Sequence, residues 1–375
     1  MSAGPLQTSK SIDGLQYLRG IAALMVVLFH ARSYFTDLPA WTGVGARGVD
    51  IFFVISGFIM AYTTREIGRD VSAVKASLLF LFKRIIRVVP LYWIALLWTS
   101  APYWLNWFST SNSLAQLYSN ISPELISIGK DFLFIPHLSL DEGEEGEIFP
   151  ILLQGWTLNF EMVFYALFAV CMLFRSYRLL AASTVLVTLV VVGKAHKFSD
   201  LYGIVYTSSI WIEFVFGMMV FWLHQRAQHL TFERIPLILL GVIGFLLLNT
   251  GSHGNDKLVL AVASSMVVLA FVFGFQGVRN TVLKLLGDAS YSIYLFHAAA
   301  FVPARALIHF LEIGSSGYLN VLTIVLVQVA YSIVIGIAVY FLIEKPLLKL
   351  LRHLFARAVS RWQKKAPEYT LSREA

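Results

Sequence analysis

Apolar residues occur along this chain in long blocks, and each block is close to the length of a membrane-spanning helix. About 20 consecutive apolar residues are enough to cross a bilayer as a helix. None of the blocks shows the ~10-residue alternation of a membrane β-strand. Ten blocks can be outlined, at 14–32, 48–64, 87–106, 150–174, 178–193, 203–224, 235–250, 257–276, 288–311 and 319–343. The pattern predicts an all-α, polytopic membrane helical bundle of about ten transmembrane helices.

Composition supports the same class of protein. The 375 residues are 58% hydrophobic and only 14% charged, with a mean hydropathy of +0.72. Soluble domains average roughly 45–50% apolar and about 25% charged residues. So few charges cannot cover the surface of a soluble enzyme of this size, and the apolar, aromatic-rich composition also excludes disorder. The single cysteine, Cys171, lies in an apolar stretch and is expected to be a small buried residue rather than a disulfide or metal ligand.

Charge along the chain predicts the topology. Basic residues concentrate in alternate connections, around 65–87, 175–178, 226–234 and 279–284, and after 345. Cytoplasmic loops of membrane proteins carry such an excess of Lys and Arg, so we expect both termini to be cytoplasmic. Most of the net charge of +7 is then a matter of topology, and no nucleic-acid partner is expected. We divide the chain into a transmembrane domain, 1–345, and a basic cytoplasmic tail, 346–375, whose amphipathic start suits an anionic membrane surface.

The longest external loop, roughly 107–149, includes an amphipathic piece and then an acidic run. We interpret the run as a solvated loop; its members are Asp141, Glu142, Glu144, Glu145 and Glu147.

Ionisable residues inside the apolar blocks are costly and therefore mark candidate functional positions. Arg19 and His30 are eleven residues apart in the first block, which places them on one helix face about 16 Å apart. Arg84 and Arg87 lie one helical turn apart just before Pro90, a spacing that suits a phosphate clamp, with membrane anchoring as the alternative.

Two further blocks carry polar groups at depth. Glu161 lies well inside the fourth block and needs a cation or its own proton as partner, with Tyr165 one turn further on. In the ninth block Tyr291, Tyr294 and His297 recur every three residues. Asp50 stands at the outer edge of the second block, where it either caps the helix or orients a neighbouring group. For Glu161 the alternative is a purely structural buried pair, and for the residues of the ninth block it is core packing.

Six strings occur in a fixed order over 11–346: DGLQYLRGIAALMVVLFH, GVDIFFVISGF, FKRIIRVVPLYW, GWTLNFEMVFY, GDASYSIYLFH and IEKP. Together they resemble the membrane acyltransferase 3 family, and the first strings are similar to bacterial exopolysaccharide O-acetyltransferases. The family's Arg and His motif falls on Arg19 and His30, its paired arginines on Arg84 and Arg87, and its Trp and Glu on Trp156 and Glu161.

The resemblance implies a multi-pass enzyme of the bacterial inner membrane. It would be an acyl-CoA-dependent O-acetyltransferase, moving an acetyl or other acyl group from cytoplasmic acyl-CoA to a hydroxyl of an exopolysaccharide or lipid-linked sugar. Acetyl-CoA is then a co-substrate, no cofactor is bound permanently, and no metal is expected. Membrane lipid is a partner, and self-association into a homo-oligomer is left open.

We therefore assign hypothetical roles. His30 is the general base, or forms an acyl-histidine, with Glu161 or Asp50 orienting its imidazole. Arg19, Arg84 and Arg87 bind the acyl-CoA donor, and the acceptor contacts Trp156, Tyr165, Tyr291 and His297. The alternative is a transporter or flippase that uses the buried Arg, His and Glu as a relay. Transfer of label from acetyl-CoA to a saccharide would separate the two.

Overall fold

The computed structural model describes residues 12–32, 40–65, 72–110, 116, 123–137, 150–227, 229–230, 232–250, 256–314 and 317–365. Over these residues the chain is almost entirely helical and contains no strand, which confirms the all-α prediction. The acidic run at 141–147 lies outside the described residues. Cys171 is buried, as expected for a small apolar-like side chain.

Each of the ten predicted blocks overlaps a long helix in the structure. These are α1 (Asp13–Arg32), α2 (Gly48–Thr64), α3 (Ala73–Thr99), α7 (Gly155–Cys171), α8 (Arg178–Ala195), α10 (Trp211–Ala227), α11 (Arg234–Thr250), α12 (Lys257–Gly274), α14 (Ser290–Phe310) and α15 (Tyr318–Val339). The connections add η1 (Ala40–Arg47), α4 (Ala101–Thr110), α6 (Pro123–Phe132), η2 (Met172–Tyr177), α9 (Leu201–Tyr206), α13 (Thr281–Asp288), the π-helical turn η4 (Tyr340–Glu344) and α16 (Lys345–Lys365).

Length and apolar composition alone single out seven helical segments of the described chain that are able to cross a membrane. One of these, Gly155–Ala195, contains both α7 and α8, and α11 appears as a shorter apolar helix. The remaining helix, α3, carries Lys83, Arg84 and Arg87 in its middle. The protein is a multi-span membrane protein, and about ten helices describe its bundle.

Two predicted boundaries were wrong. The third block was placed at 87–106, but α3 begins at Ala73, where Ser72 caps it by accepting a hydrogen bond from the Lys75 amide, and continues through Pro90. Its first half is too basic to register as apolar. The block at 203–224 is divided into α9 and α10, because residues 207–210 form a turn between them.

Close backbone approach holds the centre of the bundle together. A Cβ atom added at Gly57 of α2 would lie 2.2 Å from the Phe214 carbonyl oxygen of α10, and one at Gly217 would lie 2.1 Å from that of Val54. Small residues at such crossings let membrane helices pack through dispersion contacts. Gly57 and Gly217 therefore form a small-residue packing site between α2 and α10.

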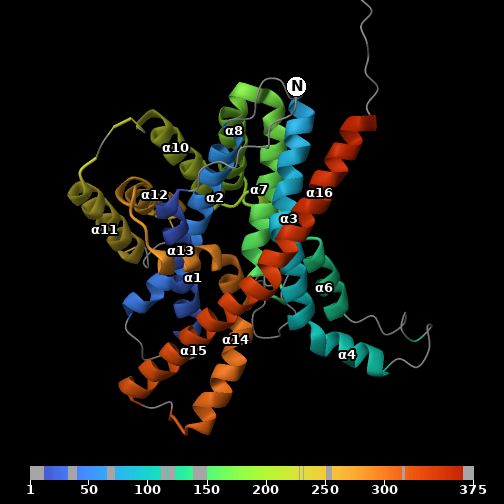
Figure 1. Cartoon of the computed structure of the whole chain (residues 1–375), viewed down its shortest axis with the longest axis vertical. Coiled ribbons are helices and arrows are strands. Elements are labelled where there is room, and N and C mark those ends of the chain that lie inside the picture. Colours follow the sequence, from blue (N-terminus) through green and yellow to red (C-terminus); the bar gives the residue numbers. More distant parts are fainter. Residues whose placement is uncertain are drawn as a thin grey trace, which may run out of the picture.

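Figure 1 shows α1 and α2 near the middle of the molecule, with α10–α12 on one side and α3, α7 and α16 on the other. The last helix, α16, runs beside α3, and the rings of Phe82 and Phe355 stack with their centroids 4.8 Å apart. The basic start of the predicted tail is therefore a helix packed on α3. Its place on the membrane surface stays a prediction.

Candidate active site

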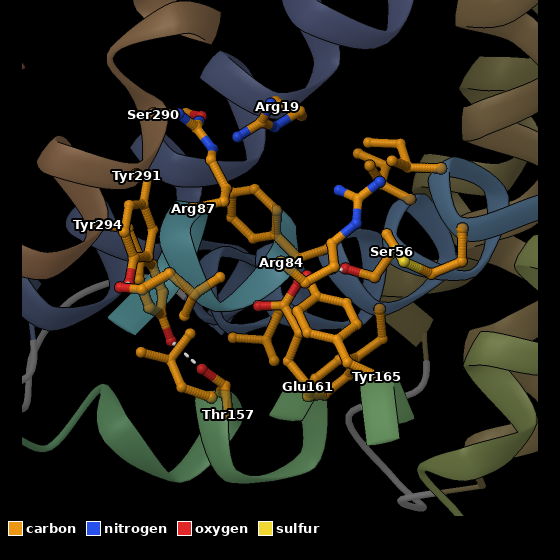
Figure 2. Close-up of a pocket in the computed structure, with 18 residues that line it drawn as sticks. Arg19, Ser56, Arg84, Arg87, Thr157, Glu161, Tyr165, Ser290, Tyr291 and Tyr294 are labelled. Carbon is orange, nitrogen blue, oxygen red and sulfur yellow. Dashed lines mark hydrogen bonds between the residues drawn. The ribbon is translucent and has the colours of Figure 1, made fainter. Parts of the chain in front are cut away.

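A cavity of about 120 Å³ opens between α1, α2, α3, α7 and α14 (Figure 2). Six of the ten residues selected from the sequence line it: Arg19, Arg84, Arg87, Glu161, Tyr165 and Tyr291. They come from four helices, and more than 270 residues separate the first from the last. Their convergence follows from the cost of leaving a charge against lipid, which drives ionisable side chains toward the bundle interior.

The three arginines enter the cavity from α1 and α3, with Glu161 and Tyr165 on its other side (Figure 2). Arg84 donates from Nη2 to Thr63 Oγ1 at 2.8 Å, and its buried Nε has no partner among the described residues. Arg19 donates to Gln16 Oε1 at 3.3 Å. A buried guanidinium nitrogen without an acceptor is costly unless a ligand supplies one.

Arg87 has a carboxylate partner from the far end of the chain. Its Nη1 lies 2.7 Å from Oε1 of Glu344, which is 1% exposed, and Ser292 donates to Oε2 of the same carboxylate at 2.6 Å. Three guanidiniums thus face two carboxylates, Glu161 and Glu344, and the described charges around the cavity sum to one positive. An anion is the ligand that this balance favours.

Glu161 is held by neutral donors. Ser56 donates to Glu161 Oε1 at 3.0 Å, and the Tyr165 hydroxyl donates to the same oxygen. The structure brings Glu161 to the arginine cavity and not to His30, so it offers no contact through which this carboxylate would orient the imidazole.

The first turn of α14 closes the cavity on another side. Tyr291 donates from its hydroxyl to the Val88 carbonyl at 2.8 Å, and the buried Ser290 hydroxyl has no described partner. Tyr294 also lines the cavity, and its hydroxyl lies 2.7 Å from Thr157 Oγ1. This wall therefore presents hydroxyl groups to the arginines.

The two histidines lie together outside the residues that line the cavity. The rings of His30 and His297 have centroids 4.9 Å apart and planes inclined by 37°. His30 Nδ1 is 3.0 Å from the Val26 carbonyl, and His297 Nδ1 is 2.8 Å from the Tyr294 carbonyl. A carbonyl only accepts, so in both neutral rings Nδ1 carries the proton and Nε2 the basic lone pair.

Arg19 and His30 occupy one helix but two places. Arg19 lines the cavity, while His30 lies eleven residues further along α1, about 16 Å away along the axis. Tyr294 connects the arginine cavity with the histidine pair. It lines the cavity, and its carbonyl accepts a hydrogen bond from His297 Nδ1. The arrangement suits an elongated ligand anchored at the arginines and reacting near the histidines.

Asp50 belongs to a separate ionic cluster. Lys257 Nζ lies 2.6 Å from Asp50 Oδ1 and 3.0 Å from Glu213 Oε1, and Arg47 Nη1 is 3.8 Å from Asp50 Oδ2. Asp50 is 3% exposed and Glu213 is fully buried. The structure joins Asp50 to the starts of α10 and α12 and places none of its described contacts at His30.

Trp156 packs on aromatic rings rather than into the cavity. Its centroid is 6.3 Å from that of Phe53 and 6.2 Å from that of Phe160, both with steep interplanar angles. This tryptophan sits in the first turn of α7, beside the cavity-lining Thr157.

Several residues of this region were not selected from the sequence, among them Ser56, Glu344, Lys257 and Gln154. Glu344 entered only as part of the string IEKP. For Glu344 and Lys257, a search for cations and anions of matching depth would have suggested pairs. No group of three or more His, Cys, Asp or Glu within the described ranges is arranged to hold a metal.

Residues 12–343 match the acyltransferase 3 family, described as "Acyltransferase domain". Since this match covers most of the sequence, the chain belongs to that family of membrane acyltransferases. It is similar to exopolysaccharide production protein ExoZ of Rhizobium meliloti (strain 1021), at 36% identity over 335 residues, covering 86% of this chain and 95% of the relative. It also resembles BcsY of Komagataeibacter xylinus, which is named as a membrane-bound transacylase, at 26% identity over 88% of this chain and 82% of the relative. No solved structure matches the chain.

Proposed function

We propose that this protein transfers an acetyl or related acyl group from acyl-CoA to a hydroxyl of an exopolysaccharide or of its lipid-linked precursor. The observation that carries the proposal is the cavity itself, in which Arg19, Arg84 and Arg87 outnumber the carboxylates around them. A relative named for exopolysaccharide production and another named as a transacylase support a saccharide acceptor and an acyl donor.

The donor would bind through its phosphates. Guanidinium groups pair with phosphate oxygens through charge-assisted, often bidentate hydrogen bonds. Arg84 has a buried Nε without a described acceptor, and Ser290 has a buried hydroxyl in the same state, so both have bonding capacity to offer an incoming oxyanion. Arg87 would share its guanidinium between that anion and Glu344.

The thioester end would then extend past Tyr294 toward His30. His30 Nε2 takes the proton of the acceptor hydroxyl as its oxygen attacks the thioester carbonyl carbon. The C–S bond breaks, the thiolate leaves, and the imidazolium returns the proton to the sulfur, so that ester and thiol are the products. In the second version His30 Nε2 attacks first and an acyl-histidine passes the group to the hydroxyl.

The orientation follows from loop charges. With the basic connections on the cytoplasmic side of a bacterial inner membrane, both termini are cytoplasmic, and acyl-CoA from the cytoplasm meets the arginines first. The acceptor would approach from the opposite face, because His30 lies two residues before the end of α1.

The test is label transfer in a reconstituted system. Purified protein in lipid nanodiscs is incubated with radiolabelled acetyl-CoA and with exopolysaccharide from which ester groups have been removed by mild base. Wild type should label the polysaccharide, and His30→Ala should lose transfer while retaining acetyl-CoA binding. Undiminished turnover by His30→Ala would reject the mechanism, and absence of any label in the saccharide with wild type would favour transport over catalysis.

A further inference from the structure

Gln154 is a buried amide that ends beside the histidine pair. Its side chain is 2% exposed, and its Nε2 lies 3.2 Å from His297 Nε2. Because His297 Nδ1 is protonated toward the Tyr294 carbonyl, its Nε2 accepts, and Gln154 is the donor. The amide orientation is thus determined by its histidine neighbour.

The other end of this amide is unused. Gln154 Oε1 is buried and has no hydrogen-bond partner among the described residues. An amide oxygen accepts hydrogen bonds and donates none, so the group that completes it must carry an O–H or N–H. A buried acceptor left unsatisfied costs free energy, which a bound hydroxyl would recover.

The segment that carries Gln154 is held rigidly. Asp131 Oδ2 accepts from the Ile151 amide at 2.9 Å, while Oδ1 of the same carboxylate lies 2.9 Å from His137 Nε2. Thr157 donates to the Gln154 carbonyl at 2.9 Å. With the backbone fixed on both sides and Nε2 engaged, Oε1 is presented in one position, as a preorganised binding group should be.

The proposed role of His30 as the base indicates which hydroxyl Gln154 Oε1 binds. In the proposed reaction the reacting hydroxyl gives its only hydrogen to His30 Nε2, so it has none left for Gln154. A second hydroxyl on the same sugar keeps its hydrogen and can donate it to Gln154 Oε1.

We infer that Gln154 binds a non-reacting hydroxyl of the acceptor sugar, next to the one that is acylated, and so selects saccharides that present two neighbouring hydroxyls. This inference rests on the proposed acyl transfer. It adds an acceptor-binding residue that acts apart from the donor cavity, since Gln154 is not among the residues that line that cavity.

Steady-state kinetics in nanodiscs separate the roles. The substrates are radiolabelled acetyl-CoA and base-treated exopolysaccharide, each varied in turn, with wild type, Gln154→Met and Gln154→Glu. Gln154→Met keeps the length of the side chain and removes both hydrogen-bonding groups. We expect its acceptor KM to rise about tenfold, the size of one lost hydrogen bond, with an unchanged KM for acetyl-CoA. Gln154→Glu keeps the contact with His297 by sharing one proton with its Nε2, retains a second oxygen as acceptor, and should restore most of the acceptor KM.

Ser264→Ala is the matched control. Ser264 is fully buried on α12 and its hydroxyl also lacks a described partner, so this variant removes an unsatisfied polar group away from the histidines. Its acceptor KM should equal that of wild type.

The outcomes distinguish this inference from the function it rests on. Transfer by wild type together with an unchanged acceptor KM in Gln154→Met would overturn the inference alone. A parallel rise of both KM values, or an equal loss with Gln154→Glu, would also overturn it, since Gln154 would then act only on the fold. No transfer by wild type would overturn the proposed function and the inference with it.

Discussion

Removing the Lys257 ammonium is expected to leave Glu213 as a buried carboxylate without a cation. Lys257 Nζ lies 3.0 Å from Glu213 Oε1 and 2.6 Å from Asp50 Oδ1. Asp50 keeps Arg47 at 3.8 Å, whereas Glu213 is fully buried and has no other basic neighbour among the described ion pairs. The loss of folding stability in Lys257→Met therefore comes mainly from the unpaired carboxylate of Glu213.

Two routes give the same magnitude. Breaking one partner of a buried ion pair costs about 3–5 kcal/mol. In the folded variant Glu213 can avoid being an unpaired charge by binding a proton. For a carboxyl group with an ordinary pKa near 4.3 in the unfolded chain, protonation at pH 7 costs about 3.7 kcal/mol. A loss of about 3–4 kcal/mol would lower Tm by roughly 6–16 °C in a domain of 150–250 residues, and by less in this longer chain.

Thermal unfolding followed by tryptophan fluorescence in one detergent measures the effect. The proton bound by the folded variant is absent from its unfolded chain at pH 7, so the deficit should shrink as pH falls. Near pH 5 the protonation cost is only about 1 kcal/mol. Lys194→Met, which removes an exposed lysine of α8, should leave Tm unchanged. Glu213→Gln in the Lys257→Met background should recover most of the loss, because the remaining buried carboxylate, Asp50, still has Arg47 as its partner.

A Tm of Lys257→Met within about 1 °C of wild type would refute this account, given the several degrees expected from the ion-pair loss. The account would also be refuted if the double variant were no more stable than Lys257→Met, because the loss of stability would then not come from an unpaired carboxylate.

Three further outcomes are expected. Arg84→Ala should raise the KM for acetyl-CoA about tenfold or more, the value of a charge-assisted hydrogen bond. Lys83→Ala, which removes the exposed cation next to it, should leave this KM unchanged. Equal effects of the two variants would reject a specific phosphate clamp. His30→Ala should abolish acyl transfer with a normal Kd for acetyl-CoA by isothermal titration, and a parallel loss of binding would place His30 in the donor site. Gly57→Val should prevent accumulation of folded protein, because even a Cβ there meets the Phe214 carbonyl at 2.2 Å; a normal size-exclusion profile would contradict the close crossing of α2 and α10.

The sequence predicts elements and depth well in this protein because both depend on local composition. Helix α3 shows the limit: its basic first half hides a continuous helix from an apolar count, although Ser72 supplies a readable cap. Arg19 and Glu161 were selected because they are charged inside apolar blocks, and Arg84 because it lies one turn from Arg87. All of them line one cavity, since a charged side chain in the membrane is stabilised by other polar groups in the bundle interior.

Pairing within the site could not be predicted in the same way. Either Glu161 or Asp50 was expected to orient His30. Glu161 instead accepts from Ser56 and Tyr165, Asp50 pairs with Lys257, and the ring of His297 lies beside that of His30. Depth along a helix is readable from sequence, whereas the direction of a side chain around the axis depends on which helices are neighbours. That information lies in contacts between residues more than a hundred positions apart.

The Arg87–Glu344 ion pair has a consequence for biosynthesis. It joins residues 257 positions apart, and Glu344 ends η4, the π-helical turn that follows α15. Membrane insertion from the ribosome proceeds from the N-terminus, so Arg87 enters the bilayer long before its partner exists. Until Glu344 is made, that guanidinium depends on water or lipid phosphate for a counter-charge. The ion pair is therefore completed near the end of translation, and chains truncated before residue 344 would keep Arg87 without this carboxylate.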